Sequence, residues 1–157
     1  WPRDRGNQAE LRSFYGQPGQ PPIKQVRCPW KLRLAWNTAQ VITTVGVHAK
    51  VANSVANVFA RVHQHYGEAE LKRLRLDLFG GCFANRKKRG GSTWSTHAWA
   101  VALDFDPARN QLKWGRERAS LADPAYAFWW KAWEEDGWVS LGRSRNFDWM
   151  HVQAARL

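Results

Sequence analysis

Two short stretches of the chain, residues 95–104 and 148–151, carry the pattern of side chains that most constrains the fold. The first contains His97 and Asp104, and the second ends at His151. Two imidazoles and one carboxylate are a typical ligand set for a catalytic Zn²⁺ site, which keeps one coordination position for water. Because zinc holds such ligands at about 2.0–2.2 Å, a chain that uses all three must bring its middle and its C-terminal part together.

The spacing inside each stretch adds a local constraint. His97 and Asp104 are seven residues apart, so a straight strand would separate them by about 23 Å and point them to opposite faces. We therefore expect the chain to turn at residues 98–100, with His97 on a loop and Asp104 on a strand. Asp148 precedes His151 by three residues, which lets both side chains converge from one turn. In that position Asp148 is a candidate acid/base group beside a water that zinc activates.

The composition is that of one folded domain with a strong positive charge. The chain has 157 residues, of which 44% are hydrophobic, so we expect a single domain spanning residues 1–157 with a sizeable core. No stretch is apolar for long enough to indicate a membrane span. The 24 Lys and Arg residues outnumber the 13 Asp and Glu residues, and the net charge of +11 favours anionic partners. Nucleic acid and anionic cell-envelope polymers fit this charge equally well.

The order of apolar residues predicts an α+β fold, with helices packed on one face of a small, mainly antiparallel sheet and the zinc site at the sheet. Residues 1–30 are rich in Pro and Gly and are expected to form an irregular N-terminal arm. Val recurs at spacings of three and four between residues 47 and 66, which predicts an amphipathic helix that Gly67 ends. A second helix is expected over residues 123–136, with Asp123 as its N-cap.

Strands are expected where apolar and charged residues alternate, or where a short apolar run is bounded by turn residues. This places extended segments at residues 32–36, 72–79, 101–105 and 151–153. Residues 85–93 are basic and rich in Gly, and they are expected to form a loop.

The cysteines and tryptophans are interpreted as core residues. One disulfide between Cys28 and Cys82 is possible, and neither cysteine belongs to a Cys-x-x-Cys motif. The preferred interpretation is that both are small buried side chains. Several of the 11 tryptophans crowd one stretch, where core packing is preferred over a stacking surface for a substrate. These are Trp129, Trp130, Trp133 and Trp138.

The two stretches that contain the candidate zinc ligands read Ser-Thr-His-Ala-Trp-Ala-Val-Ala-Leu-Asp over residues 95–104 and Asp-Trp-Met-His over residues 148–151. Together they resemble the zinc D-alanyl-D-alanine carboxypeptidase family. That family includes vancomycin-resistance-type dipeptidases and carboxypeptidases, and phage L-alanyl-D-glutamate endopeptidases that act as endolysins. The similarity extends over most of residues 12–154, including residues 14–16, 80–83 and 106–110.

The resemblance implies a role for each residue of the pattern. His97, Asp104 and His151 take the places of the three zinc ligands. Asp148 takes the place of the acid/base carboxylate, which is Glu in many members of the family and Asp in some. Ser95 matches a serine that shapes the site and is expected to contribute to substrate binding.

Two further positions bear on the resemblance. Arg86 matches an arginine that polarises the scissile carbonyl or holds a substrate carboxylate, and it is expected to serve catalysis or substrate binding. An ordinary loop cation remains the alternative for Arg86, and Arg89 is the substitute candidate. Ala100 stands where the family usually has Gly. A positive φ there would strain alanine, and the preferred interpretation is that the position requires only a small side chain.

The resemblance implies a zinc metallopeptidase that hydrolyses an amide bond in the stem peptide of peptidoglycan. An L-alanyl-D-glutamate endopeptidase is the first expectation, and a D-alanyl-D-alanine carboxypeptidase is the alternative. Rivals from other classes are a degenerate member that only binds and a basic nucleic-acid-binding module using residues 86–89. No nucleic-acid-binding motif supports the latter, so the expected partners are the stem peptide and anionic envelope polymers, with no nucleic acid and no membrane span.

The expected place of action follows from the expected substrate. A peptidoglycan peptidase works at the bacterial cell wall or in the periplasm, and a phage lysin would be made in the host cytoplasm and released through a holin. We expect a monomer. Because the chain begins at Trp1 rather than Met, a trimmed signal peptide or a lost wall-binding module remains open, as does the choice between a phage and a bacterial origin.

Overall fold

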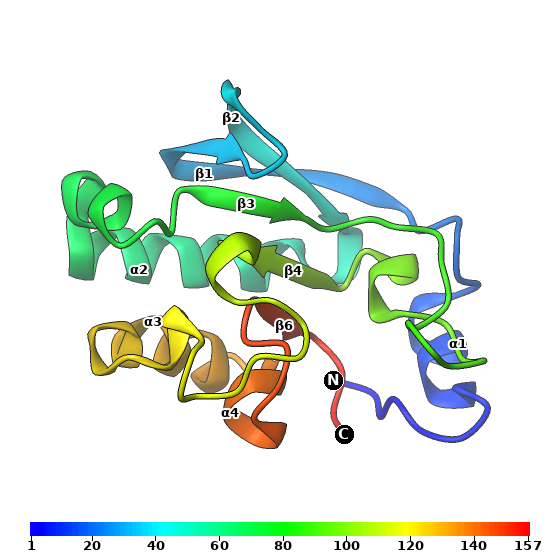
Figure 1. The fold of residues 1–157 in the computed structure, drawn as a ribbon. Helices are drawn as coiled ribbons and strands as arrows, with labels where there is room; N and C mark the ends of the chain where they lie inside the picture. Colours follow the sequence, from blue (N-terminus) through cyan, green and yellow to red (C-terminus); the bar gives the residue numbers. More distant parts are fainter.

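A six-stranded sheet with the strand order β2-β1-β3-β4-β6-β5 runs through the molecule (Figure 1). The computed structural model describes every residue from Trp1 to Leu157. Neighbouring strands are antiparallel except β1 and β3, so the sheet is mixed. The strands are β1 (Ile23–Leu34), β2 (Asn37–His48), β3 (Leu78–Gly81), β4 (Ala102–Phe105), β5 (Val139–Ser140) and β6 (His151–Gln153).

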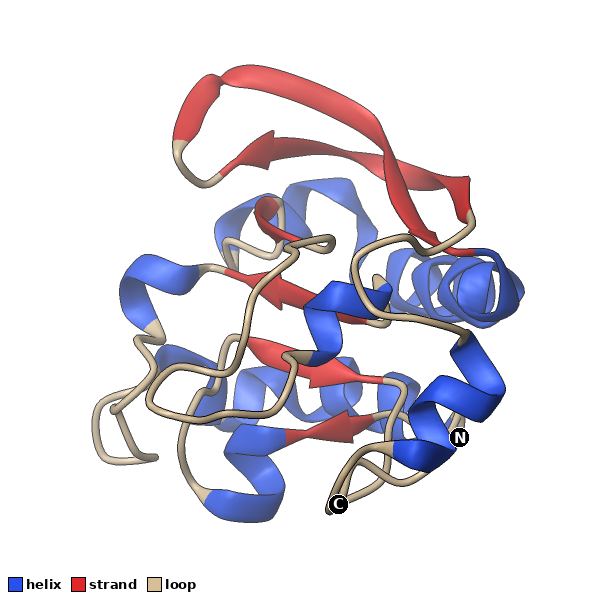
Figure 2. Cartoon of the chain, turned by 90° about the vertical axis from the view of Figure 1, so that its right-hand side faces the viewer, coloured by secondary structure: helices blue, strands red, loops and turns tan.

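Four α-helices complete the α+β domain, and none is both long and apolar enough to cross a bilayer. The helices are α1 (Ala9–Tyr15), α2 (Ala52–Arg73), α3 (Ala127–Glu135) and α4 (Leu141–Arg145). Short 3-10 turns lie at Ala49–Val51, Thr96–Trp99, Pro107–Arg109, Ser120–Ala122 and Pro124–Tyr126. Figure 2 shows the long β1–β2 hairpin at one end of the sheet, beyond the shorter strands.

The alternation of side chains along β4 and β6 separates a core face from a polar face. Phe105 of β4 is buried and packs edge-on against Trp129 of α3, with ring centroids 4.8 Å apart. Val152 of β6 is fully buried as well. Asp104 and His151 alternate with these residues and are register partners on the adjacent strands. The pairing therefore places a carboxylate and an imidazole side by side on the face turned away from α3.

The prediction of an irregular N-terminal arm over residues 1–30 is wrong. The segment contains α1, and β1 begins at Ile23. Most of its Pro and Gly residues fall in the link at 16–22, whereas Leu11 and Tyr15 of α1 are buried. The Tyr15 hydroxyl donates a hydrogen bond to the Ala154 carbonyl at 2.8 Å. That bond ties α1 to the C-terminal part of the chain, and the two buried side chains anchor it in the core.

The boundaries predicted between residues 47 and 79 also need correction. Residue 47 belongs to β2, a strand that was not predicted, and α2 begins only at Ala52. Gly67, with φ 74° and ψ 160°, is not helical and ends the first helical segment of α2 as predicted, and a second helical segment continues to Arg73 after this kink. Since the helix uses the first residues of the strand expected at 72–79, β3 is confined to Leu78–Gly81.

Other predicted elements are confirmed. β4 and β6 lie at the expected positions, residues 85–93 join elements as a loop, and residues 32–34 are extended as the end of β1. Asp123 caps the turn that leads into α3 by accepting a hydrogen bond from the Ala125 amide. The four clustered tryptophans are at most 2% exposed and belong to the core, as predicted. Cys28 and Cys82 are buried free thiols in the same core.

Candidate metal centre

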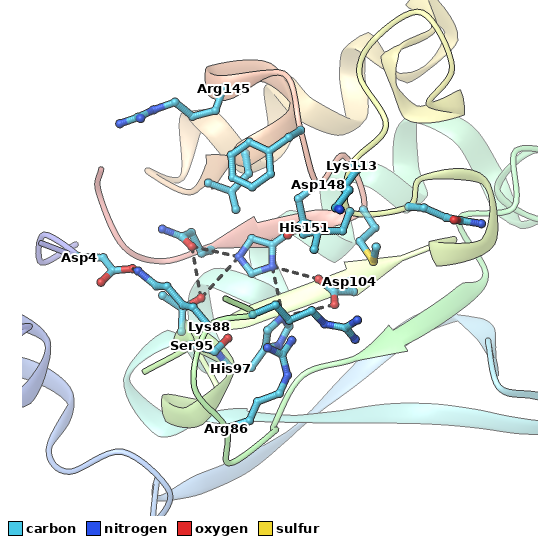
Figure 3. Close-up of a pocket in the computed structure, with 18 of the residues that line it drawn as sticks. Asp4, Arg86, Lys88, Ser95, His97, Asp104, Lys113, Arg145, Asp148 and His151 are labelled. Atoms are coloured by element: carbon cyan, nitrogen blue, oxygen red, sulfur yellow. Dashed lines mark hydrogen bonds and ion pairs between the residues drawn. The ribbon is translucent and has the colours of Figure 1, made fainter. Parts of the chain in front are cut away.

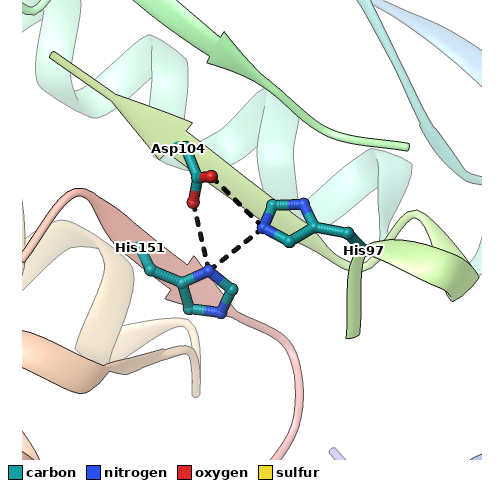
Figure 4. A group of neighbouring side chains, drawn as sticks. All are labelled: His97, Asp104 and His151. Atoms are coloured by element: carbon teal, nitrogen blue, oxygen red, sulfur yellow. Dashed lines mark hydrogen bonds and ion pairs between the residues drawn. The ribbon is translucent and has the colours of Figure 1, made fainter. Parts of the chain in front are cut away.

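Three side chains from separate parts of the chain converge at the sheet (Figure 4). His97 comes from the turn Thr96–Trp99, Asp104 from β4 and His151 from β6. His97 Nε2 lies 3.3 Å from Asp104 Oδ2, Asp104 Oδ1 lies 3.1 Å from His151 Nδ1, and the two imidazole nitrogens are 3.2 Å apart. Both imidazoles are buried, with 4% of each residue exposed. The cluster is a set of three mutually adjacent donors that could hold a metal ion.

The other nitrogen of each imidazole is held away from the cluster by a neighbour. His97 Nδ1 lies 2.6 Å from the Cys82 carbonyl oxygen, and His151 Nε2 lies 3.0 Å from Gln153 Oε1. Gln153 is itself oriented, because its amide nitrogen donates to the Ala155 carbonyl at 3.0 Å. A ring N–H that donates to these oxygens leaves His97 Nε2 and His151 Nδ1 as lone-pair donors toward the centre.

Gln153 was not singled out as a site residue from the sequence. A signal for it was present, because residues two apart on a strand share a face and Gln153 follows His151 by two. Its side chain is 3% exposed and shares the polar face of β6 with His151. Gln153 therefore acts on the cluster by orienting an imidazole, which the ligand pattern alone does not reveal.

The expected turn between His97 and Asp104 is present and positions the first imidazole. Ser95 caps the turn, since its Oγ accepts a hydrogen bond from the His97 amide at 3.4 Å, and its own amide donates to the Arg86 carbonyl at 3.1 Å. Ser95 thus links the basic loop to His97. Ala100 ends the turn in the left-handed conformation, with φ 54° and ψ 40°.

The interpretation that position 100 requires only a small side chain is therefore wrong. Ala100 adopts the positive φ that favours glycine, and it is fully buried. Its amide bonds to the His97 carbonyl at 3.0 Å, and its carbonyl accepts from the His48 amide at 2.8 Å. These two bonds hold an alanine in a conformation that costs about 1–2 kcal/mol.

Charge in the cluster is set by one carboxylate between two imidazoles. Burial alone would raise the pKa of Asp104, but His97 and His151 outweigh burial and lower that pKa below its ordinary value. Burial would lower the pKa of His151, but its hydrogen bond and charge interaction with Asp104 raise it. Burial also raises the pKa of the nearby Cys82 thiol. Cys82 contributes its backbone carbonyl oxygen to the site, and its sulfur is not one of the three clustered donors.

Asp148 lies in the turn before β6 and lines the same cavity as the three donors. Its amide donates to the Leu112 carbonyl at 2.9 Å, and its carbonyl accepts from the His151 amide at 3.1 Å. These bonds hold Asp148 at φ 53°. Burial raises the pKa of Asp148 above its ordinary value, although the charges of His151, His97 and Arg86 act in the opposite direction. A carboxyl group of this kind suits proton transfer in either direction.

The cavity around the cluster has a volume of about 910 Å³ and a basic lining (Figure 3). Ser95, Arg86 and Arg89 line it, as does Asp148. The Arg86 guanidinium donates to the Lys87 carbonyl at 3.2 Å and forms no ion pair. The structure thus brings the six predicted site residues to one cavity, and both arginines of the basic loop reach it.

Comparison of the chain with known protein families, with curated protein sequences and with solved structures finds no match. The fold and the site define a class on their own terms, a small α+β domain with a buried His/Asp/His cluster on its mixed sheet.

Proposed function

We propose that the chain is a zinc-dependent peptidase that hydrolyses an amide bond in the stem peptide of peptidoglycan. The observation that carries the proposal is the convergence of His97 Nε2, Asp104 and His151 Nδ1, with every other ring nitrogen occupied by a neighbour. A carboxylate with a raised pKa, Asp148, lies in the same cavity. This combination matches the needs of hydrolysis better than those of a purely structural site, which closes all four positions with protein ligands.

The donor set fits zinc in number and spacing. Donors that each lie about 2.1 Å from a tetrahedral ion are about 3.4 Å from one another. The observed separations of 3.1, 3.2 and 3.3 Å are close to that value. Three protein ligands of the types N, N and O are typical of catalytic zinc, and the same set also serves ferrous iron. We assign zinc because the neighbouring carboxylate suits hydrolysis.

Zinc held here would act as a Lewis acid and lower the pKa of water, which supplies the nucleophile. Asp148 takes a proton from the attacking water as the water oxygen bonds to the amide carbon. Asp148 then returns the proton to the nitrogen as the carbon–nitrogen bond breaks, which releases an amine and a carboxylate. Arg86 contacts the carbonyl oxygen or a carboxylate of the peptide, for which a guanidinium is well suited.

The bond between L-alanine and D-glutamate is the proposed target. Support comes from the resemblance of the stretches at 95–104 and 148–151 to phage endopeptidases, from the aspartate at position 148, and from the net charge of +11, which suits adsorption to an anionic wall. The site of action would then be the bacterial cell wall. Removal of a terminal D-alanine is the alternative.

Digestion of purified peptidoglycan, followed by mass spectrometry of the products, tests the proposal. Release of whole stem peptides is expected from the zinc-loaded protein, loss of activity with a chelator, and recovery on addition of zinc. Loss of single D-alanine residues would instead identify the alternative carboxypeptidase. Elemental analysis is expected to find one zinc per chain, and neither His97→Ala nor His151→Ala should retain it. One equivalent of iron in place of zinc would contradict the metal assignment.

A further inference from the structure

Trp36 differs from every other tryptophan of the chain in its exposure. Of the 11 tryptophans it is the only exposed one, with 66% of the residue accessible to solvent. It lies in the tight turn between β1 and β2, where Leu34 and Asn37 are register partners. A single exposed apolar side chain is ordinary on a protein surface. Its position relative to the metal ligands is what gives this one a role.

The indole of Trp36 lies against the strand that borders the metal ligands. β3 runs between β1 and β4 (Figure 1). The Ala35 amide donates to the Phe79 carbonyl at 2.9 Å, which fastens the turn to β3. Cζ3 of the indole lies 3.8 Å from the point that a β-carbon on Gly81 would occupy, and Gly81 is the register partner of Asp104. Only one strand spacing, about 5 Å between paired Cα atoms, therefore separates the residue under the indole from a metal ligand.

Two glycines keep the surface between the indole and that ligand free of side chains. A β-bulge between Phe79 and Gly81 sets Gly80 and Gly81 opposite Asp104. A β-carbon on Gly80 would lie 3.0 Å from the Asp104 β-carbon, and Gly81 has φ 114°, so both positions favour glycine. Residues directly opposite each other share a face of the sheet. The two glycines thus form a shelf of bare backbone, the glycine shelf, on the face that carries the donors.

We propose that Trp36 is a stacking platform for the sugar ring to which the stem peptide is attached. The inference rests on the proposed peptidase function and specifies the substrate on the amino-terminal side of the scissile bond. The apolar face of the ring packs on the indole, and the hydroxyl groups stay in water. Trp36 does not line the cavity, so the platform extends the site past the glycine shelf.

The length of the substrate agrees with this placement. In peptidoglycan a lactyl group joins L-alanine to the sugar, so one amino acid and one lactyl unit separate the L-alanyl-D-glutamate bond from the ring. Two such units span at most about 7 Å. From a carbonyl at the cluster, that length crosses the glycine shelf. A terminal D-alanine is attached roughly 16 Å from the sugar, so a platform at Trp36 favours the endopeptidase over the carboxypeptidase.

The surface around Trp36 suits a neutral, hydroxyl-rich ligand. Residues 34–47 contain no charged side chain, in a chain of which 24% of the residues are charged. The nearest preceding cation on β1, Arg33, is bound to Asp77 at 2.7 Å. A nucleic acid or an anionic membrane needs free cations beside the aromatic ring, because phosphates dominate its binding. A sugar linked through an amide carries no such requirement.

Calorimetric titration with two ligands tests the platform. One is L-alanyl-D-glutamate with the muramyl sugar on its lactyl group, and the other has a methyl group on the lactyl oxygen in place of the sugar. The protein is the zinc-loaded Asp148→Asn variant, so that neither ligand is consumed. We expect the sugar to tighten binding about fivefold to tenfold, the gain from burying roughly 50 Å² of apolar surface. Adding Trp36→Ala should remove most of this ratio, and adding Trp36→Tyr should keep most of it, because tyrosine retains a flat ring.

The matched control is Val41→Ala, because Val41 belongs to the same hairpin, is 52% exposed and lies outside the cavity. This control should keep the ratio. Equal affinity for the two ligands, no binding of either, or an equal loss of the ratio in Val41→Ala overturns the platform. So does an equal loss of affinity for both ligands in Trp36→Ala, which would place the indole on the peptide.

Hydrolysis of peptidoglycan by the wild-type protein is scored separately. Sugar-dependent binding without hydrolysis contradicts the peptidase and leaves the platform standing. Hydrolysis together with equal affinity for the two ligands contradicts the platform alone.

Discussion

Asp148 is the residue on which turnover should depend most directly, without holding the metal. It lies outside the three-donor cluster, and burial raises its pKa above the ordinary value of 3.8. Replacing it by Asn keeps the shape and removes the proton acceptor. We expect Asp148→Asn to bind one zinc and to lose about 10²–10⁴-fold in kcat, the usual contribution of general acid–base catalysis. Full activity in this variant would contradict its role.

The pH dependence follows from the direction of the same pKa shift. A base must be deprotonated to accept a proton, so kcat/KM should fall as the pH drops through the pKa of Asp148. Since that pKa is raised, the fall should begin at a higher pH than an exposed aspartate would give. The residual activity of Asp148→Asn should lack this acidic limb. Measuring kcat/KM against pH for both proteins checks the assignment, provided that metal content is determined at each pH.

Ala100 tests how much the turn before β4 depends on its left-handed backbone. For Ala100→Gly, relief of about 1–2 kcal/mol of strain is offset by a lost methyl group, about 0.8 kcal/mol, and by greater chain entropy. We expect a change in unfolding free energy within about 1 kcal/mol. Ala100→Val should destabilise by about 2 kcal/mol or more, because a β-branched residue at positive φ in a full core meets steric conflict. Equal stability of the two variants by denaturant unfolding would show that the turn relaxes.

At the residue level, the sequence predicted the donors but not the groups that orient them. His97, Asp104 and His151 are recognisable because their types and spacings are unusual together. The roles of Gln153 and of the Cys82 carbonyl were not predicted, because a glutamine has no distinctive sequence signature and a backbone carbonyl has none at all. Their roles depend on which nitrogen of each ring faces the cluster, which only the fold decides.

Among the elements, the basic loop depends on α1 for its position. Gln8 directly precedes that helix, is 2% exposed, and bonds through both ends of its amide to Trp94, the residue that follows the loop. Its Nε2 donates to the Trp94 carbonyl at 2.8 Å, and its Oε1 accepts from the Trp94 amide at 2.9 Å. We expect Gln8→Ala to cost about 1–3 kcal/mol, because partly buried backbone groups lose their partners.

Hydrogen exchange locates the effect of this change. The Trp94 amide should lose protection in Gln8→Ala, and limited proteolysis should increase within residues 85–93. Gln20→Ala is the matched control, because Gln20 is exposed and makes no hydrogen bond. Unchanged exchange at Trp94 would show that the loop holds its conformation without α1.

Elements with a clear local period were predicted, and elements defined by long-range pairing were not. The run at 101–105 and the segment at 151–153 gave strands where expected. β2 was missed because most of its residues are exposed, so no alternation of apolar and polar side chains marks it. α1 was missed because turn residues follow it closely, and its two buried side chains gain their value from contacts with distant parts of the chain.

For the whole molecule, metal binding should stabilise the fold. The three donors come from positions 97, 104 and 151 and meet only when the sheet has formed. An ion that binds only the folded state adds about 2.7 kcal/mol at a free concentration 100 times its Kd. For a chain of this size we expect Tm to rise by roughly 5–10 °C with zinc. His97→Ala should show no such rise, and an equal rise in that variant would indicate binding elsewhere.

The pairing of β4 with β6 makes strand alignment a condition for chemistry as well as for stability. Asp104 lies opposite His151, and Leu103 lies opposite Val152. A slip of β6 by one residue would turn the His151 imidazole into the apolar core and place an aliphatic side chain beside His97 and Asp104. Burial of the apolar neighbours on these strands therefore fixes the register in which the two strands pair. Any substitution that lets the last strand shift should abolish metal affinity before it unfolds the protein.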